Sequence, residues 1–150
     1  AKARLAKAHG CDYSIIYSSE NFVDRVRKIT KGEMLPVVYD SIGKATWPAS
    51  LDCLKKRGMF VSFGNASGPV TEINPMILMQ KGSLVMTRPT LFDFVSTPEE
   101  LQKSAGEVMK VIKSGAVKIE VNHKSSLREA GRAHRDLAAR KTTGSIVLEP

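Results

Sequence analysis

Apolar and polar residues alternate along this chain with the periods of buried strands and of amphipathic helices. A short apolar run at residues 37–39 is followed by residues 47–54, where apolar side chains recur at helical spacing, and by a second apolar run at residues 59–63. A nearly continuous apolar strand, a helix and another such strand predict a right-handed parallel β-α-β unit. Ligands of such sheets bind outside the carboxyl ends of the strands, so we expect a site at these two strand ends.

The same pattern predicts elements on both sides of this unit. Upstream, we expect a helix over residues 1–9, a strand at residues 13–17, and a helix that begins at the cap Ser19 and ends at Gly32. Downstream, the expected elements are a strand at 83–87, a helix from 97 to 115, a strand at 117–121, a helix over 127–140 and a strand at 144–148. Thr97, Pro98 and Glu100 form a helix-start signature in which the threonine caps and the glutamate occupies the third helical position.

The order of these elements predicts an α/β fold with two regions. Helices and strands alternate over residues 1–93 with loop lengths typical of a doubly wound parallel sheet, and the rhythm changes from about Phe94. No capping residue precedes the first predicted helix, so we expect the sequence to begin inside a larger fold.

The amino-acid composition is typical of a globular protein. It has 150 residues, of which 42% are hydrophobic and 25% charged, enough for one domain with its own core. No apolar run approaches a membrane span, and the first ten residues do not resemble a signal peptide. Cys11 and Cys53 are far apart and belong to no CxxC pair, so we expect buried thiols in a cytoplasmic protein rather than a disulfide or metal site.

The formal net charge of +8 favours an anionic partner: a nucleic acid, a membrane surface or a phosphorylated small molecule. Lysine and arginine are spread between apolar positions, so most of them are expected to lie on solvated helix faces, with a few positions held for a phosphate. Arg128, Arg132 and Arg135 fall on one face of the last helix, which leaves open an RNA- or partner-binding module as an alternative ranked below the small molecule.

Candidate chemistry is concentrated at the two strand ends. Residues 40–43 and 64–68 are small or polar, and two such turns on consecutive parallel strands favour a ligand more than either turn alone. Asp40 is interpreted as a carboxylate that caps its turn rather than as a catalytic group. The three histidines are not at metal-ligand spacing, and neither a serine-histidine-aspartate order nor a pair of carboxylates stands out, so we assign no metal and no catalytic residue.

Four segments carry a resemblance: VVYDSIG, SLDCLKKRGMFVSFGNASG, QKGSLVMTRPTL and RAHRDLAARKTTGSIVL. Together they resemble the zinc-independent NADPH:quinone oxidoreductases, the zeta-crystallin-like branch of the medium-chain dehydrogenase/reductase superfamily, over essentially the whole chain. The resemblance implies an incomplete Rossmann sheet plus a C-terminal segment of the catalytic domain. Residues 1–93 would be the C-terminal portion of the NADP-binding domain, without its first two strands and glycine-rich turn, and residues 94–150 would return to the catalytic domain.

The resemblance also implies contacts with NADPH. Lys2 would meet the 2′-phosphate and Tyr17 the adenosine phosphate, and Arg140 would lie near the cofactor. The remaining implied contacts lie at the strand ends, at Ser41, Ile42, Gly64, Asn65, Ala66 and Ser67, with Phe63, Pro89, Thr90 and Leu91 walling the nicotinamide end. A solvated helix lysine, a tyrosine at the core edge and an arginine favoured by the helix dipole remain the alternatives for the first three.

The implied activity is hydride transfer from NADPH to a quinone or another small electrophile. The cofactor carries the chemistry, so no protein acid or base is assigned. The chain would supply part of the cofactor site, would be inactive alone, and would form a homodimer through the strand at 83–87. An alcohol or enoyl reductase of the same superfamily remains the alternative, because this sequence does not determine the acceptor.

Overall fold

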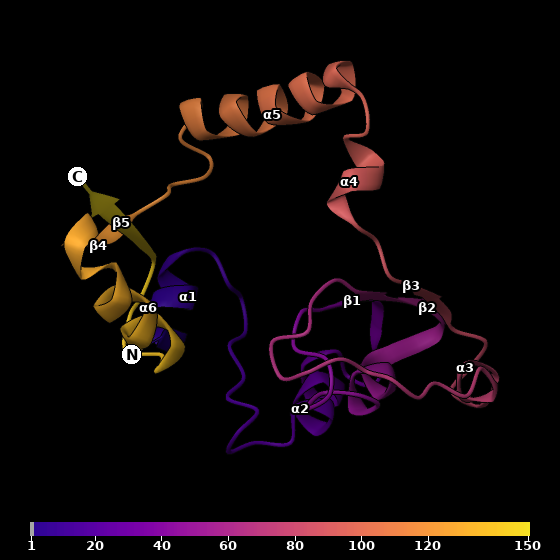
Figure 1. The fold of residues 1–150 in the computed structure, drawn as a ribbon. Coiled ribbons are helices and arrows are strands. Elements are labelled where there is room, and N and C mark those ends of the chain that lie inside the picture. Colours follow the sequence, from indigo (N-terminus) through magenta and orange to yellow (C-terminus); the bar gives the residue numbers. More distant parts are fainter. Residues whose placement is uncertain (1) are drawn as a thin grey trace. The chain divides into compact units, whose positions relative to one another are not determined.

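The computed structural model describes residues 2–150 and divides into two compact units. One unit contains residues 3–93, and the other contains Lys2 with residues 94–150 (Figure 1). The elements, in chain order, are α1 (Lys2–Ala8), α2 (Phe22–Ile29), β1 (Leu35–Asp40), the 3-10 helix η1 (Ala49–Cys53), β2 (Leu54–Ser62), α3 (Met76–Gln80), β3 (Val85–Thr87), α4 (Leu91–Phe94), α5 (Pro98–Lys113), β4 (Val121–Ser126), the 3-10 helix η2 (Leu127–Glu129), α6 (Ala130–Ala138) and β5 (Ser145–Glu149).

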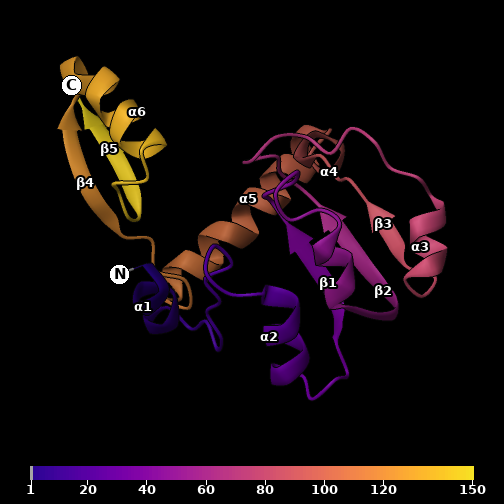
Figure 2. The ribbon, with the colours of Figure 1, turned by 90° about the horizontal axis from the view of Figure 1, so that it is seen from below.

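The first unit is built on a parallel sheet in the order β1-β2-β3 (Figure 2). Val38 of β1 pairs with Phe60 of β2, and Phe60 pairs in turn with Met86 of β3. The expected α/β class with parallel strands is therefore confirmed. Because all three strands run the same way, their carboxyl ends lie at one edge of the sheet, where the candidate residues were expected.

A small apolar core lies against this sheet. Leu51 and Phe60 are almost fully buried, at 1% and 2% exposure, and Leu54 and Leu84 complete the buried cluster. The indole of Trp47 packs on the ring of Phe60, with ring centroids 5.6 Å apart. Fully burying one such side chain contributes about 1.5–3 kcal/mol. Through Leu51 of η1 and Phe60 of β2, the core thus holds both elements in place next to the candidate site.

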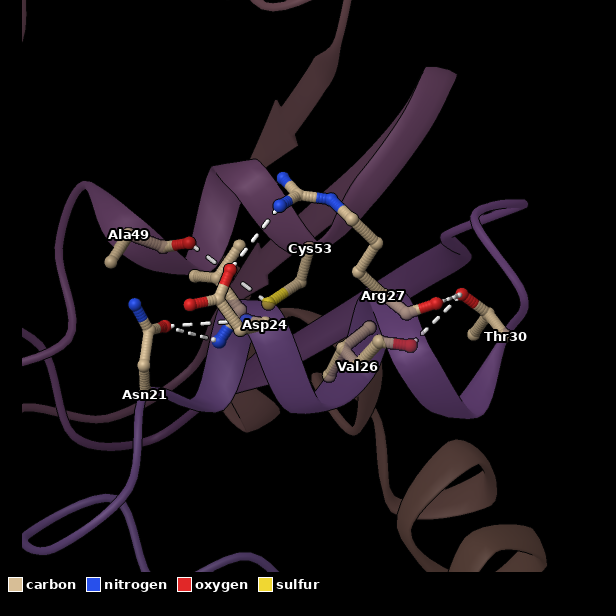
Figure 3. A network of polar contacts seen from close by, with 8 residues as sticks. Asn21, Asp24, Val26, Arg27, Thr30, Ala49 and Cys53 are labelled. Carbon is tan, nitrogen blue, oxygen red and sulfur yellow. Dashed lines mark hydrogen bonds and ion pairs between the residues drawn. The ribbon is translucent and has the colours of Figure 1, made fainter.

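Helix α2 begins at Asn21 rather than at the predicted cap Ser19. The Asn21 Oδ1 accepts hydrogen bonds from the amides of Val23 at 3.0 Å and Asp24 at 3.3 Å (Figure 3). Ser19 instead donates its hydroxyl to the carbonyl of Ile16 at 3.2 Å. Asparagine and serine cap helices about equally well, so the sequence offered two candidates and the path of the chain decided between them.

The predicted strand at residues 13–17 is wrong. No strand among residues 2–150 pairs with this segment, which is irregular, and Tyr13 and Ile16 are 62% and 51% exposed. Apolar β-branched composition favours a strand, but a strand forms only where a neighbour supplies hydrogen-bond partners for its backbone.

The predicted helix over residues 47–54 is also wrong in type and extent. A single 3-10 helix, η1, covers Ala49–Cys53, and β2 begins at Leu54 rather than at Met59. Pro48 disfavours helical backbone at Trp47 and donates no amide, which shortens the element from its start. Within β2, Arg57 has a positive φ of 61°.

The second unit contains helix α5 and a parallel pair of strands, β4 and β5, with α6 between them in the chain. The predicted helix start is confirmed, because the Thr97 side chain accepts from the Glu100 amide and the Glu100 carboxylate accepts from the Thr97 amide. The strand expected at 117–121 lies instead at 121–126, where it pairs with β5. The expected final helix is confirmed with shorter bounds, and the expected final strand is confirmed one residue further along the chain. In the described part of the chain, no helix has the length and apolar character needed to cross a bilayer.

Candidate functional site

The end of β1 is organised by the buried carboxylate of Asp40, which is 5% exposed. Its Oδ1 accepts hydrogen bonds from the amides of Ile42 at 2.7 Å and Gly43 at 3.0 Å. Its Oδ2 accepts hydrogen bonds from the hydroxyls of Thr46 and Ser50, both at 2.7 Å. The expectation that Asp40 caps its turn is confirmed. The two hydroxyl partners were missed, because nothing distinguishes Thr46 and Ser50 in the sequence except their distance from Asp40.

The Asp40 carboxylate is held in its ionised form by these donors. Burial by itself raises the pKa of Asp40, since a charged group loses its hydration. The hydrogen bonds from Thr46, the Gly43 amide, Ser50 and the Ile42 amide together outweigh burial, and the pKa of Asp40 lies below its ordinary value of 3.8. The carboxylate is therefore a fixed negative charge whose acceptor capacity is filled by the surrounding protein.

The turn after β1 is bound to the turn after β2 along its length. The amide of Phe63 donates to the Asp40 carbonyl at 2.9 Å, and the amide of Ala66 donates to the Ser41 carbonyl at 3.0 Å. In the opposite direction, the Lys44 amide donates to the Gly68 carbonyl at 3.0 Å. The two strand ends that the sequence singled out thus form one continuous surface.

The Ser67 side chain joins the two turns. Its hydroxyl donates to the Ile42 carbonyl at 2.7 Å and accepts from the Ala45 amide at 2.9 Å. The hydroxyl hydrogen is therefore used within the protein. Ser67 was predicted from the resemblance as a cofactor contact; in this structure its hydroxyl binds the neighbouring turn.

Two glycines allow the turns to approach each other. Gly43 has a positive φ of 84°, and a Cβ at this position would lie 2.4 Å from the Gly68 carbonyl oxygen. A Cβ on Gly64 would lie 2.7 Å from the Ser41 carbonyl oxygen. The small residues were interpreted as room for a ligand close to the main chain. In the structure they are also required for the contact between the turns.

Exposed aromatic and polar groups surround these turns. The rings of Tyr39 and Phe63 meet edge to face with centroids 6.4 Å apart, and Phe63 remains 50% exposed. Val61, two residues before Phe63, pairs with Thr87, which ends β3 two residues before Pro89. Exposed side chains follow each strand: Asn65 and Ala66 come after β2, and Thr90 and Leu91, the first residue of α4, come after β3. Flat apolar surface beside amide and hydroxyl groups is the chemistry that binds a nucleotide ring and its ribose.

A groove of about 260 Å³ runs beside β1 in the same unit. Tyr17, Ser41 and Ile42 lie along it, so the structure brings these three predicted residues together. Asp40 and Cys53 also line the groove. Burial first, and then the negative charge of Asp52, raise the pKa of the Cys53 thiol to about 11, with Arg27 opposing in part. Cys53 is thus an un-ionised buried thiol as expected, whereas Cys11 is exposed, contrary to expectation.

Lys2 and Arg140, the other two predicted contacts, both belong to the C-terminal unit. The Lys2 ammonium donates to the Arg140 main-chain carbonyl at 3.1 Å. Arg140 has a positive φ of 57° just after α6. An ammonium carries three donors, so this bond leaves two of them for other acceptors.

The basic face of the last helix is partly neutralised. The Arg132 guanidinium forms an ion pair with Glu129 at 2.9 Å.

Among residues 2–150, no three histidine, cysteine, aspartate or glutamate side chains gather as metal ligands. His123 accepts a hydrogen bond from the Thr143 amide at 3.2 Å.

Comparison with known proteins places this geometry in context. A family model described as zinc-binding dehydrogenase matches residues 9–148. A quinone oxidoreductase of Pseudomonas aeruginosa is 57% identical over 149 residues, which is 99% of this chain and 46% of that protein. A 2-haloacrylate reductase of a Burkholderia species is 42% identical over 99% of this chain and 45% of its own length.

Solved structures show the same similarity to quinone oxidoreductases. The crystal structure of Escherichia coli quinone oxidoreductase complexed with NADPH superposes with a TM-score of 0.94 at 47% identity, covering 99% of this chain and 46% of that one. This chain spans about half the length of the relatives it matches and corresponds to their C-terminal part.

Proposed function

This chain belongs to the zinc-binding dehydrogenase family, and from that premise we propose that it supplies part of an NADPH site in a quinone oxidoreductase. The observation that carries the proposal is the joined pair of turns at the carboxyl ends of β1 and β2, which is where parallel sheets bind nucleotides. The E. coli relative, which is 47% identical, is a complex with NADPH. Relatives named for quinones and for 2-haloacrylate support a small electrophilic acceptor without fixing which one.

The chain's own residues bind and orient the cofactor in this proposal. Phe63 and Leu91 offer apolar surface to the nicotinamide end, with Pro89 beside them, and Asn65 and Thr90 offer polar groups to the adjoining ribose. Ser41 and Ile42, with Tyr17 along the groove, face the adenosine side. When bound, NADPH supplies a hydride to the acceptor, so the protein's role is position and electrostatics. We also propose that this chemistry proceeds without zinc and that the protein, with two unpaired cysteines, is cytoplasmic.

Discrimination between NADPH and NADH is assigned to Lys2. A contact between an ammonium and a dianionic phosphate is a charge-assisted hydrogen bond, which is stronger than an exposed ion pair. The free donors of Lys2 suit the 2′-phosphate, which only NADPH carries. The Arg140 carbonyl that accepts from Lys2 keeps the ammonium in place.

Titration of nicotinamide fluorescence on the full-length protein that contains this chain tests the proposal. Wild type should bind NADPH much more tightly than NADH, and Lys2→Ala should remove most of that preference. Lys7→Ala is the matched control, because Lys7 lies on the same helix, α1, and should leave the preference intact. Absence of NADPH binding by the wild type, or equal affinity for both nucleotides, would refute the proposal.

We further propose a homodimer formed through residues 83–87. The sheet order leaves β3 at an edge, with unpaired backbone groups of the kind that pair with another strand. The RNA-binding alternative is weaker than the sequence alone suggested, since one of its three arginines, Arg132, is paired with Glu129.

A further inference from the structure

The two oxygens of the Asp40 carboxylate have different partners. Oδ1 binds only main-chain amides of the turn after β1, those of Ile42 and Gly43. Oδ2 binds the hydroxyls of Thr46 and Ser50, which lie before and within η1. One buried side chain therefore joins the turn to the helix that is anchored in the core.

Ile42 transmits this constraint to the second turn. Its amide is held by Asp40, while its carbonyl accepts from both the amide and the hydroxyl of Ser67, at 2.8 Å and 2.7 Å. A displacement of the Asp40 carboxylate would release the Ile42 amide, and movement of that residue would carry the Ser67 contacts with it.

We propose that Asp40 is a positioning residue for the cofactor site, fixing the turn at residues 41–43 directly and the turn at residues 64–67 through Ile42 and Ser67. The inference rests on the proposed function. Asp40 lines the groove, but its buried carboxylate has no oxygen left for a cofactor group, because four protein donors occupy both oxygens. Its effect is exerted entirely through the positions of the exposed residues that follow each strand.

Two substitutions at this position separate its roles. Asp40→Asn keeps one oxygen that can accept from both amides, and its new amide group can donate to the hydroxyls of Thr46 and Ser50. The Thr46 hydroxyl has an alternative acceptor in the Gly43 carbonyl, 3.1 Å away, so the asparagine can be accommodated. Asp40→Ala removes both sets of contacts and leaves buried donors without an acceptor.

The experiment measures the dissociation constant for NADPH by nicotinamide fluorescence in the full-length protein. Asp40→Ala should weaken binding roughly tenfold, as expected for lost hydrogen bonds to a charged group, and Asp40→Asn should recover part of that loss. Leu84→Val, a core variant away from the turns, should lower the melting temperature without changing the dissociation constant. Asp52→Asn is the matched control for Asp40→Asn, because it makes the same chemical change at a carboxylate that pairs with Lys81.

The outcomes are separable. Unchanged NADPH affinity in both Asp40 variants overturns the positioning role and leaves the proposed function standing. An equal loss of affinity in Leu84→Val also overturns it, because the effect would then follow from stability alone. If the wild type fails to bind NADPH, the proposed function falls and the positioning role with it. Should Asp40→Ala not fold, Ser50→Ala, which removes a single donor to Oδ2, should still weaken binding a few-fold, and unchanged binding would count against the role.

Discussion

Ser67 bonds to the carbonyl oxygen of Ile42 twice, through its amide at 2.8 Å and through its hydroxyl at 2.7 Å. The same hydroxyl accepts from the Ala45 amide at 2.9 Å, so one exposed serine joins two turns that lie 25 residues apart in sequence. The candidate site is consequently a single surface, in which hydrogen bonds hold the two turns together, rather than two independent loops.

Ser67→Ala should lower the free energy of unfolding by roughly 1 kcal/mol, because it removes two hydrogen bonds that are open to solvent. Urea denaturation followed by tryptophan fluorescence measures the change, because Trp47, the only tryptophan of these 150 residues, lies in the same unit. Ser19→Ala is the control, since that hydroxyl bonds to the carbonyl of Ile16 only three residues away. Equal effects in the two variants would mean that the bridge between the turns adds no stability.

Gly43→Ala should be much more damaging than a glycine substitution at a comparable backbone conformation. Gly10 and Gly43 have similar positive φ values, 92° and 84°, but a Cβ on Gly10 meets nothing within 4 Å. Gly10→Ala therefore measures the backbone penalty alone, about 1–2 kcal/mol. Gly43→Ala adds the collision with the Gly68 carbonyl, worth roughly another 1–3 kcal/mol.

Thermal or urea unfolding of the two variants gives the comparison directly. Gly106→Ala, in helix α5 with open space around it, should be neutral or slightly stabilising and shows that alanine itself is tolerated. If Gly43→Ala costs no more than Gly10→Ala, the close approach of the turns is not as the structure describes.

The stability contributed by the Asp40 hydrogen bonds should depend on pH. The folded-state pKa lies below 3.8, so the folded protein binds fewer protons than the unfolded chain in the range just below that value. This stability is fully present above pH 3.8 and declines as the pH falls towards the folded pKa. The Cys53 thiol in the same groove, with a pKa of about 11, stays neutral throughout.

Urea titrations of wild type and Asp40→Asn from about pH 6 down to about pH 3 provide the test. The difference in unfolding free energy between the two proteins should be largest at the higher pH and shrink on acidification. Parallel profiles would contradict the prediction.

The sequence predicted those features of the fold that depend on local patterns. The capping box at Thr97 and the parallel strands at residues 37–39 and 59–63 were predicted correctly, because cap chemistry and buried apolar runs depend on short local stretches of sequence. The strand at residues 13–17 was not formed, because pairing depends on a neighbour that no local pattern specifies. In the site, the small residues at the strand ends were visible, but the bonds of Thr46 and Ser50 to Asp40 arise only from folding.

The two cysteines should react very differently with an alkylating agent. Cys11 is exposed, whereas Cys53 is 3% exposed and its pKa is raised to about 11. Since the thiolate is the reactive form, Cys53 should stay unlabelled by iodoacetamide near neutral pH while Cys11 is modified. Peptide mass spectrometry of the labelled protein distinguishes the two, and labelling in urea should make them equivalent. Equal rates in the folded state would place Cys53 outside the core.

Val85→Lys should convert the proposed homodimer into monomers. Val85 is 48% exposed on the edge strand β3, where an added charge opposes pairing with a second copy. Met86, its neighbour, packs against the core, so lysine there would unfold the sheet and confuse the result. Size-exclusion chromatography with light scattering on the full-length protein reports the mass. Val147→Lys, at a strand valine that is 38% exposed on β5, should leave the dimer intact. A wild type that runs as a monomer, or a Val85→Lys variant that stays dimeric, would rule out pairing through residues 83–87.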